Sequence, residues 1–248
     1  MDAAPPLSVR EAFWLPTNSP IVGCIGALVD HKGHRHLVHA ATDIVRAVPD
    51  ARVVILGEGE LRGDLTRLIH DLGLERHVLL PGFRPDVLSL LKTFDVFVMP
   101  SITEGLGTSI LDAMACAKAV VASAVGGIPE VVEPEVTGLL VPPRDPGTLG
   151  AAVVRLLRDP ALARRLGEAG RVRVEQRFSA ERMGLSKRQR IGGRYSAEFR
   201  VEAFNLLNTP IFDFVDTDIN STTFGRVLQL EPNATASRVV QLAVKFNF

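Results

Sequence analysis

The sequence has few of the residues on which several protein classes depend. Its 248 residues include 2 cysteines, 1 tryptophan and 1 tyrosine, and its formal net charge is +0 at pH 7. We expect Cys24 and Cys116 to be buried thiols, which argues against a disulfide scaffold and favours a reducing compartment. The lack of net positive charge removes the electrostatic case for nucleic acid as a partner.

The chain also lacks the long apolar runs of membrane-spanning and exported proteins. No run of about 18 apolar residues occurs, so no transmembrane helix is predicted. The first residues contain Pro5, Pro6 and Pro16 and lack the apolar core of a signal peptide. We therefore expect a cytoplasmic protein whose contact with a membrane is peripheral at most.

Composition changes sharply near residues 184–193. Asparagine is absent between Asn18 and Asn205, and 7 of the 12 phenylalanines lie at or beyond Phe199. The part before this change is rich in Ala, Leu, Val and Arg. We infer that two segments of different origin meet at a junction over 184–193.

Residues 20–183 alternate strands and helices in the manner of a parallel sheet. Continuous apolar runs such as Ile21–Ile25 fit strands buried on both faces, and amphipathic segments such as His34–Val48 fit helices. The pattern predicts the α/β class, with a doubly wound, Rossmann-like parallel sheet that binds ligands at the carboxyl ends of its strands. The predicted strands are 21–25, 53–56, 78–80, 95–99, 119–122 and 138–141, and the predicted helices are 34–48, 61–72, 86–93, one ending at 116, 148–158 and 161–176.

Residues 101–112 combine an acid, a glycine-rich turn and a helix start directly after an apolar strand. Glycine lets the backbone approach a ligand closely, and the free N–H groups of a helix start favour an anion. We expect Asp112 to lie about two turns into the helix, too far from Glu104 to share a proton. The pattern predicts two acids that hold separate sets of sugar hydroxyls around a phosphate. The alternative for Glu104 is an acid that merely flanks a helix.

Other loops at strand ends offer further candidate contacts. Lys32 follows the first strand and is a candidate for a diphosphate contact, and the alternative is a solvated lysine at a helix start. His31 and His34 either contact a ligand or are polar loop residues, and the sequence leaves both possibilities open.

The loop Gly57–Gly59 is a candidate for a close approach to a ligand, and the alternative is an ordinary strand-to-helix turn. Phe83 offers a ring beside a planar base, and the alternative is a loop with one buried Phe. Residues 126–130 form a further close-approach loop, and the alternative for Glu130 is a solvated acid.

Together these motifs closely resemble the donor-binding half of the GT-B retaining glycosyltransferases, family 4, or glycosyl transferases group 1. The resemblance covers residues 15–183 and implies a nucleotide diphosphate sugar as donor substrate, with no cofactor and no metal. It implies that 20–183 are the donor-binding domain and that 1–19 are the remnant of a linker. The matching motifs are Gly26–Gly33, Gly57–Gly59, Pro81–Phe83, Glu104–Ala115, Gly126–Val131 and Thr137–Val141.

The resemblance also implies residue roles. Glu104 would hold the donor sugar, Asp112 the ribose, and Lys32 would neutralise the diphosphate, so that Glu104 and Lys32 are the candidate catalytic residues. The further candidate substrate-binding residues are Gly26, Gly57, Gly82, Phe83, Gly105, Leu106, Gly107 and Thr108, of which Gly82 and Phe83 would lie near the nucleobase and the backbone around 106–108 would face the diphosphate.

The sequence departs from the family pattern at several places. Ala27 stands where many members have Arg, and Asp112 stands where Glu is usual. Residues 1–19 are too few for the N-terminal acceptor domain of a full enzyme. The resemblance therefore implies donor binding with little or no transfer by this chain alone, and it does not indicate whether the acceptor is a sugar, a lipid or a polysaccharide.

Residues 194–248 change to the period-two alternation of half-buried strands. Tyr195–Ala203 and Val240–Phe248 each have the length of a strand that crosses a bilayer at a tilt. This short antiparallel β tail resembles the last strands of TonB-dependent outer-membrane receptors. Because it holds too few strands to close a barrel, we expect it not to act in transport.

The sequence thus predicts the donor domain of a retaining glycosyltransferase fused to a β tail. Two alternatives stay open. One is an outer-membrane receptor fragment whose α/β part is incidental, and the other is a non-catalytic nucleotide-binding or interaction module. Equal affinity for a nucleotide with and without its sugar would favour the latter.

Overall fold

The computed structural model describes residues 8–105 and 107–178, together with the backbone of strand segments 185–191, 195–204, 214–215, 227–229 and 239–247. The chain forms two compact units, Met1–Gln176 and Arg177–Phe248. Leu106 and Phe248, which belong to the sequence-predicted motifs, lie outside the described residues, and so do residues 184 and 192–193 of the predicted junction.

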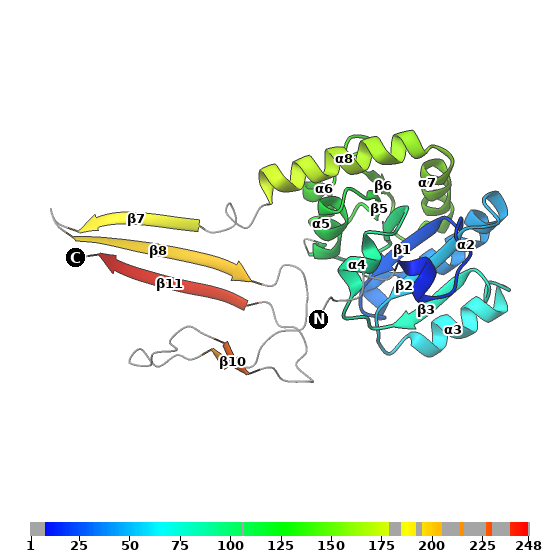
Figure 1. Cartoon of the computed structure of the whole chain (residues 1–248), viewed down its shortest axis with the longest axis horizontal. Coiled ribbons are helices and arrows are strands. Elements are labelled where there is room, and N and C mark those ends of the chain that lie inside the picture. Colours follow the sequence, from blue (N-terminus) through cyan, green and yellow to red (C-terminus); the bar gives the residue numbers. More distant parts are fainter. Residues whose placement is uncertain are drawn as a thin grey trace, which may run out of the picture. The chain divides into compact units, whose positions relative to one another are not determined.

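The first unit is built on a parallel sheet of 6 strands in the order β3-β2-β1-β4-β5-β6 (Figure 1). Strand β1 lies between β2 and β4: its Cys24 pairs with Ile55, and its Gly23 pairs with Phe97. The strand order therefore reverses beside β1, and sheets of this kind bind ligands at the carboxyl ends of the strands at such a point. The strands are β1 Ile21–Ile25, β2 Arg52–Leu56, β3 Val78–Gly82, β4 Val96–Met99, β5 Ala119–Ser123 and β6 Leu139–Val141.

The helices connect these strands in the expected alternation. They are α1 Val9–Ala12, the 3-10 helix η1 Asp30–Lys32, α2 His34–Ala47, α3 Arg62–Asp71, α4 Val87–Leu91, α5 Thr108–Ala115, α6 Ile128–Val131, α7 Pro146–Arg158 and α8 Pro160–Arg177. Among the described residues, none of these helices is both long enough and apolar enough to cross a membrane.

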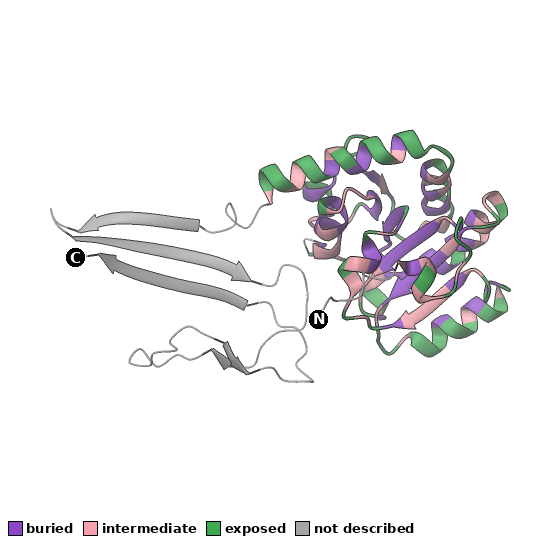
Figure 2. Ribbon diagram, in the orientation of Figure 1, coloured by how far each residue is buried: buried purple, intermediate pink, exposed green. Residues whose placement is uncertain are grey.

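Helices cover both faces of the sheet. On one face, Val53 and Val98 pack with Leu37 of α2 and Leu149 of α7. The alternate strand residues, such as Phe97, are equally buried and face helices that include α5, which packs on β4 and β5. Figure 2 shows the buried strands in purple and the exposed outer surface of α8 in green. The predicted doubly wound, Rossmann-like α/β fold is confirmed.

Two predicted details near the candidate pocket are wrong. Gly107 has a left-handed φ of 69° and α5 begins only at Thr108. Asp112 therefore lies just over one turn into the helix rather than about two. Cys116 follows the last turn of α5 and is half-buried, whereas Cys24 is buried as expected.

The residues before β1 include a helix that the sequence analysis missed. Helix α1 has a capping box, in which Ser8 Oγ accepts from Glu11 N at 3.2 Å and Glu11 Oε2 accepts from Ser8 N at 2.8 Å. Val9 is fully buried, and Arg10 pairs with Asp95 at 2.7 Å. Helix α1 therefore packs on the rest of the first unit. The predicted domain boundaries after residues 19 and 183 stay predictions.

The described strands of the second unit pair antiparallel, as the alternation in the tail predicts. Val201 of β8 pairs with Leu185 of β7 and with Leu242 of β11. Strand β7 falls within the predicted junction at 184–193. The strands are β7 Leu185–Ile191, β8 Tyr195–Phe204, β9 Phe214–Val215, β10 Val227–Gln229 and β11 Val239–Asn247, in sheets ordered β11-β8-β7 and β10-β9.

Candidate functional site

The candidate site lies where the parallel strands end. Loops 26–33, 57–61, 100–105 and 124–127 follow β1, β2, β4 and β5, respectively. Because β1 and β4 are neighbours in the sheet, the loops that carry Lys32 and Glu104 lie next to each other. The fold thus brings together the two candidate catalytic residues.

Lys32 and Glu104 form an ion pair between these two loops. Their Nζ and Oε2 atoms lie 2.6 Å apart, and their side chains are 24% and 7% exposed, respectively. Ser101 Oγ donates to the same carboxylate oxygen at 3.2 Å, and Gly105 N donates to Oε1 at 3.2 Å. Lys32 is therefore held by an acid rather than freely solvated. Salt screens such a shielded pair less than it screens a surface pair.

Backbone contacts hold the two loops together. The carbonyl oxygen of His31 accepts from Ile102 N at 2.8 Å and from Thr103 N at 3.3 Å. Gly33 has a φ of +66°, and a Cβ at this position would lie 2.1 Å from the oxygen of Pro100. A glycine is required here, and the close approach that it permits keeps Lys32 within reach of Glu104.

The loop after β5 supports the Glu104 loop from another side. Gly127 N donates to Gly105 O at 2.8 Å. Gly126 has a φ of +53°, and a Cβ there would lie 1.7 Å from Glu104 O. We expect this loop to approach a ligand, and in the structure it closely approaches the backbone of Glu104.

Three candidate glycines meet at the ends of β1, β2 and β3. Gly57 N donates to Gly82 O at 3.0 Å, and a Cβ on Gly57 would lie 2.0 Å from Gly26 O. Gly26 N in turn donates to Leu56 O at 3.0 Å. The backbone hydrogen bonds of the sheet therefore continue into these loops. The residues that meet at this edge are glycines, which have no side chain.

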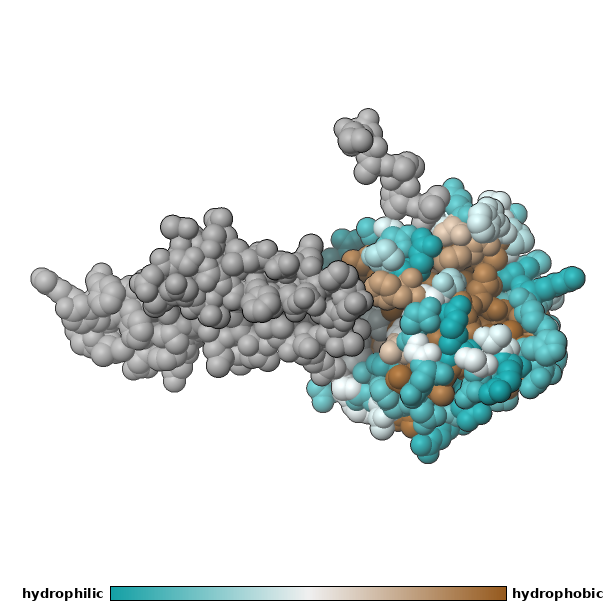
Figure 3. Space-filling model, turned by 90° about the horizontal axis from the view of Figure 1, so that it is seen from below, coloured by the Kyte–Doolittle hydropathy of each residue, from teal (hydrophilic) through white to brown (hydrophobic). Residues whose placement is uncertain are grey.

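Phe83, next to these glycines, is 58% exposed, so the alternative of a buried loop Phe is wrong. Neighbouring Arg84 donates to Asp86 at 2.8 and 2.7 Å and lies over the Phe13 ring, 5.6 Å from its centroid. Trp14 is also exposed. Figure 3 shows that the face drawn there carries apolar areas, in brown, among polar areas, in teal. The exposed ring of Phe83 offers a stacking surface for a planar group.

Helix α5 begins beside Glu104. Its Gly107 N-cap offers no side chain to its first N–H groups, and Thr108 is the first helical residue. Such N–H groups and the aligned peptide dipoles favour an anion at this end of the helix. The start of α5, three residues after Gly105, therefore adds a second source of positive potential to the loop that carries Glu104.

Asp112 occupies a less polar environment than Glu104. Burial raises the pKa of its carboxyl to about 7. In the described part of the chain, no hydrogen bond or ion pair joins its side chain to Lys32 or Glu104. The two acids are thus separate groups: Glu104 is paired with Lys32, whereas the pKa of Asp112 is raised by burial.

His34 is a buried structural residue. Its Nε2 donates to Ala27 O at 2.9 Å, and its Nδ1 lies 3.5 Å from Cys24 Sγ. Burial lowers the pKa of His34 and raises that of Cys24 to about 12, so both groups are neutral at pH 7. His34 fixes the backbone of the loop ahead of Lys32, and a ligand role for it is not supported.

Sequence reasoning missed Ser101, although a Ser three residues before an acid is a visible signal. Its side chain is fully buried and donates to Glu104. Within the ranges that the structure describes, no group of three or more His, Cys, Asp or Glu side chains could hold a metal ion.

Two family models match this chain. The model of glycosyl transferases group 1 matches residues 9–173. A model of an outer membrane beta barrel domain matches residues 143–241, so the two matches overlap from 143 to 173. The first match covers the whole parallel sheet, and the second begins before α7 and extends into the tail.

Curated relatives are glycosyltransferases. The GDP-mannose-dependent monoacylated alpha-(1-6)-phosphatidylinositol monomannoside mannosyltransferase of Corynebacterium glutamicum is 35% identical over 181 residues, which are 70% of this chain and 47% of that protein. The alpha-D-kanosaminyltransferase of Streptomyces kanamyceticus is 35% identical over 162 residues, 64% of this chain and 42% of that protein. The chain spans about half the length of the curated relatives that it matches.

Solved structures share the fold of the first unit. Anabaena Alr3699/HepE, in complex with UDP and glucose, has a TM-score of 0.65 and 28% identity, with 69% of this chain and 47% of that chain covered. The C-terminal domain of LpcC from Francisella tularensis, a glycosyl transferase group 1 family protein, has a TM-score of 0.63 and 25% identity, with 68% and 90% covered. The match therefore spans nearly all of a C-terminal domain studied by itself.

Proposed function

Because this chain belongs to the glycosyl transferases group 1 family, we propose that its first unit binds a nucleotide diphosphate sugar, the donor of a retaining glycosyl transfer. The observation that carries the proposal is the shielded ion pair between Lys32 and Glu104, 2.6 Å apart, beside the start of α5. It offers a cation to a diphosphate and a carboxylate to sugar hydroxyls at one sheet edge. The UDP and glucose in the Alr3699/HepE structure and the GDP-mannose dependence of the Corynebacterium relative support it.

We assign the parts of the donor to residues by their chemistry. Glu104 accepts hydrogen bonds from the sugar hydroxyls, and Asp112 accepts them from the ribose. Lys32 exchanges Glu104 for the phosphate oxygens, which also face the N–H groups at the start of α5. Phe83 lies against the base. The binding set is completed by Gly26, Gly57, Gly82, Gly105, Leu106, Gly107 and Thr108.

The proposed reaction transfers the sugar with retention at its anomeric carbon. The bond from this carbon to the diphosphate oxygen breaks and its electron pair leaves with the diphosphate. The acceptor hydroxyl bonds to the same carbon and passes its proton to the departing diphosphate oxygen. Lys32 and the N-terminus of α5 meet the charge that develops on the diphosphate, and donors fixed before the reaction are effective at this task. In this proposal no metal or cofactor takes part.

We further propose that residues 20–183 supply the donor-binding half of a transferase site. The curated relatives are about twice as long as the part that matches. In the family, an acceptor domain of similar size supplies the other wall of the cleft. The acceptor itself, whether a sugar, a lipid or a polysaccharide, is not assigned.

Thermal unfolding in the presence of nucleotide sugars tests donor binding. A compound that binds only the native state at 100 times its Kd stabilises it by about 2.7 kcal/mol. We expect at least one of UDP-glucose, GDP-mannose and ADP-glucose to raise the midpoint of unfolding, and Glu104→Ala to reduce that rise. Asp50→Ala, which removes an exposed acid just before β2 and therefore at the opposite edge of the sheet, is the matched control. An unchanged midpoint with all three compounds would count against the proposal.

The match of residues 143–241 to an outer membrane beta barrel domain supports a second candidate. In this alternative the tail is the end of an outer-membrane receptor, of the TonB-dependent kind, and the α/β part is incidental. The pairing of β8 with β7 and β11 is consistent with that origin. Cell fractionation separates the two candidates, since a membrane pool favours the receptor fragment and a pool in the soluble fraction favours the donor domain.

A further inference from the structure

A cavity of about 390 Å³ lies at the edge of the sheet where the strands begin, opposite the candidate donor site. Val96 and Ala119, the first residues of β4 and β5, form part of its wall. Leu156 near the end of α7 and Ala163 near the start of α8 form another part. The cavity therefore belongs wholly to the first unit and shares no residue with the Lys32–Glu104 pocket.

Cations outnumber acids around this cavity. Arg10, Lys118 and Arg164 line it together with one acid, Asp95. Asp95 is already satisfied, because its Oδ2 accepts from Arg10 Nη2 at 2.7 Å and from Ile21 N at 2.7 Å. Arg10 also donates to the carbonyl oxygens of Ser19 and Thr93. Because Arg10 and Asp95 neutralise each other, the net positive charge of the cavity lining comes from Lys118 and Arg164.

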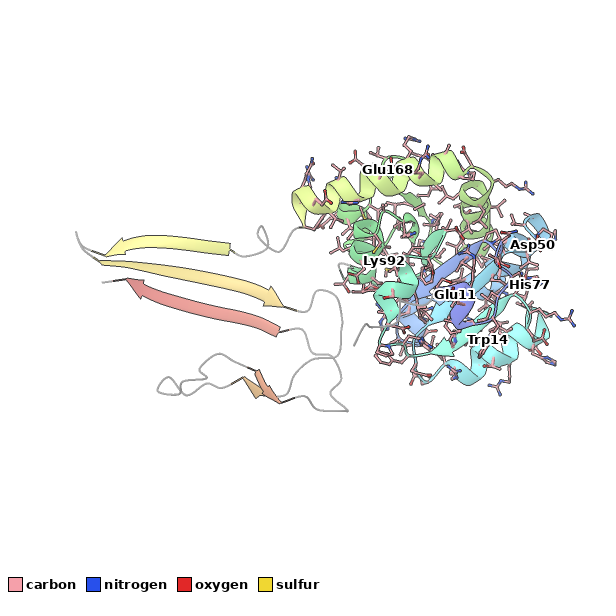
Figure 4. All side chains as sticks on the ribbon, in the orientation of Figure 1. Glu11, Trp14, Asp50, His77, Lys92 and Glu168 are labelled. Atoms are coloured by element: carbon pink, nitrogen blue, oxygen red, sulfur yellow. The ribbon has the colours of Figure 1, made fainter. Side chains whose placement is uncertain are left out.

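These two side chains differ in how they are held. Lys118 is half-buried, and no hydrogen bond or ion pair engages its ammonium group within residues 8–105 and 107–178. Arg164 is exposed at the mouth of the cavity, where its Nε lies 4.0 Å from Oε1 of Glu168, which Figure 4 labels on α8. That pair is weak, because both side chains are well exposed. Both cations are thus available to an incoming anion.

The wall beside the cations is apolar. Phe94, Leu156 and Ala119 are each at most 2% exposed and line the cavity, with Leu157 and Pro160 nearer the surface. A hydrated inorganic ion would leave this apolar wall exposed to water, whereas an apolar group would remove its surface from water, which is favourable. The cavity thus combines a cationic side with an apolar side.

We propose that this cavity binds a small organic anion, with its carboxylate or phosphate on Lys118 and Arg164 and its apolar part against Phe94 and Leu156. The volume suits a molecule of the size of a substituted ring. Burial lowers the pKa of Lys118, and an anion beside the ammonium group opposes that shift. No residue of the site takes part in the proposed donor chemistry, so this inference does not rest on the proposed function.

Calorimetry on the full chain with phenyl phosphate, inorganic phosphate and benzyl alcohol tests the proposal. We expect phenyl phosphate to bind one to one and about tenfold more tightly than either other compound, since only it engages both sides of the cavity. Lys118→Gln should weaken it about tenfold or more. Arg165→Gln, which removes an exposed neighbouring charge that does not line the cavity, should leave its affinity unchanged.

Two further variants test whether a loss of binding comes from misfolding of the protein and whether phenyl phosphate binds at the other edge of the sheet. Ala163→Phe fills the cavity without removing a charge and should abolish phenyl phosphate binding while the unfolding transition stays cooperative. Lys32→Met removes the cation at the opposite edge and should leave phenyl phosphate binding intact. Equal binding of phenyl phosphate and inorganic phosphate, equal losses in Lys118→Gln and Arg165→Gln, or loss in Lys32→Met would each overturn the proposal.

Discussion

Lys32 Nζ lies 2.6 Å from Glu104 Oε2, although 72 residues separate the two in sequence. The pair joins the loop after β1 to the loop after β4. The same contact therefore stabilises the carboxyl edge of the sheet and presents the groups to which we assign the donor. Changes to either residue should alter stability as well as binding.

Lys32→Met is expected to lower the free energy of unfolding by about 1–3 kcal/mol, because it leaves the shielded Glu104 carboxylate without its cation. The double variant Lys32→Met/Glu104→Gln should recover part of that loss, since the buried charge is then gone. Denaturant titration of the wild type, both single variants and the double variant measures the coupling. Strictly additive effects would show that the pair does not stabilise the protein.

Gly126→Ala is expected to destabilise the first unit by about 2 kcal/mol or more, because a Cβ at this left-handed residue would lie 1.7 Å from Glu104 O. It should also weaken donor binding, since the displaced backbone carries Glu104. Gly63→Ala on α3 is the matched control: a Cβ there meets nothing within 4 Å, and helix propensity favours Ala by up to about 1 kcal/mol. If both alanine variants unfold at the same denaturant concentration, the close contact at Gly126 has no energetic consequence.

Arg173 of α8 fixes the segment behind the Gly126–Gly127 loop. Its Nε donates to Val131 O at 2.8 Å and its Nη2 donates to Glu130 O at 2.9 Å, at the end of α6. Arg173→Met should therefore speed hydrogen exchange of the Gly127 amide, which donates to Gly105 O. The control is Arg171→Met, because Arg171 pairs with Glu175 on the same helix. Equal exchange rates in the two variants would argue against this positioning role.

The raised pKa of Asp112 predicts a pH dependence of stability. Burial moves the pKa from 3.8 to about 7, so between these values the native state holds a proton that the unfolded state releases. The contribution of this group is complete below 3.8 and is lost as pH rises toward 7. Asp112→Asn, which stays neutral, should flatten the plot of unfolding free energy against pH over this window. Parallel plots for the variant and the wild type would contradict the assignment.

Apolar runs and glycine punctuation were sufficient to predict the parallel sheet of the first unit. Strand β1 is continuously apolar because both of its faces are covered, and this pattern is visible without a structure. Helix α1 was not predicted because it is only 4 residues long and has no apolar periodicity to detect. Its capping box, Ser8 followed by Glu11, is nevertheless visible in the sequence. The start of α5 was misplaced because Gly107 adopts a left-handed conformation that composition alone does not dictate.

The sequence placed the candidate site residues at strand ends, but it did not predict the contacts between them. Spacing placed Lys32 and Glu104 at strand ends, yet their ion pair depends on β1 and β4 being neighbours, which is a long-range property of the sheet. The close contact of Gly126 with the backbone of Glu104 is likewise a long-range contact between two loops. The cavity beside Lys118 had no sequence signal, because four separate segments form it.

The most direct test of donor binding compares each nucleotide sugar with its bare nucleotide by calorimetry, in the wild type and in Glu104→Ala. UDP-glucose with UDP, GDP-mannose with GDP and ADP-glucose with ADP form the three pairs. We predict that for one pair the wild type binds the sugar nucleotide more tightly, and that Glu104→Ala weakens the sugar nucleotide more than the nucleotide. Equal affinity for both members of every pair, unchanged in Glu104→Ala, would contradict the donor assignment and indicate a nucleotide-binding module without a sugar site.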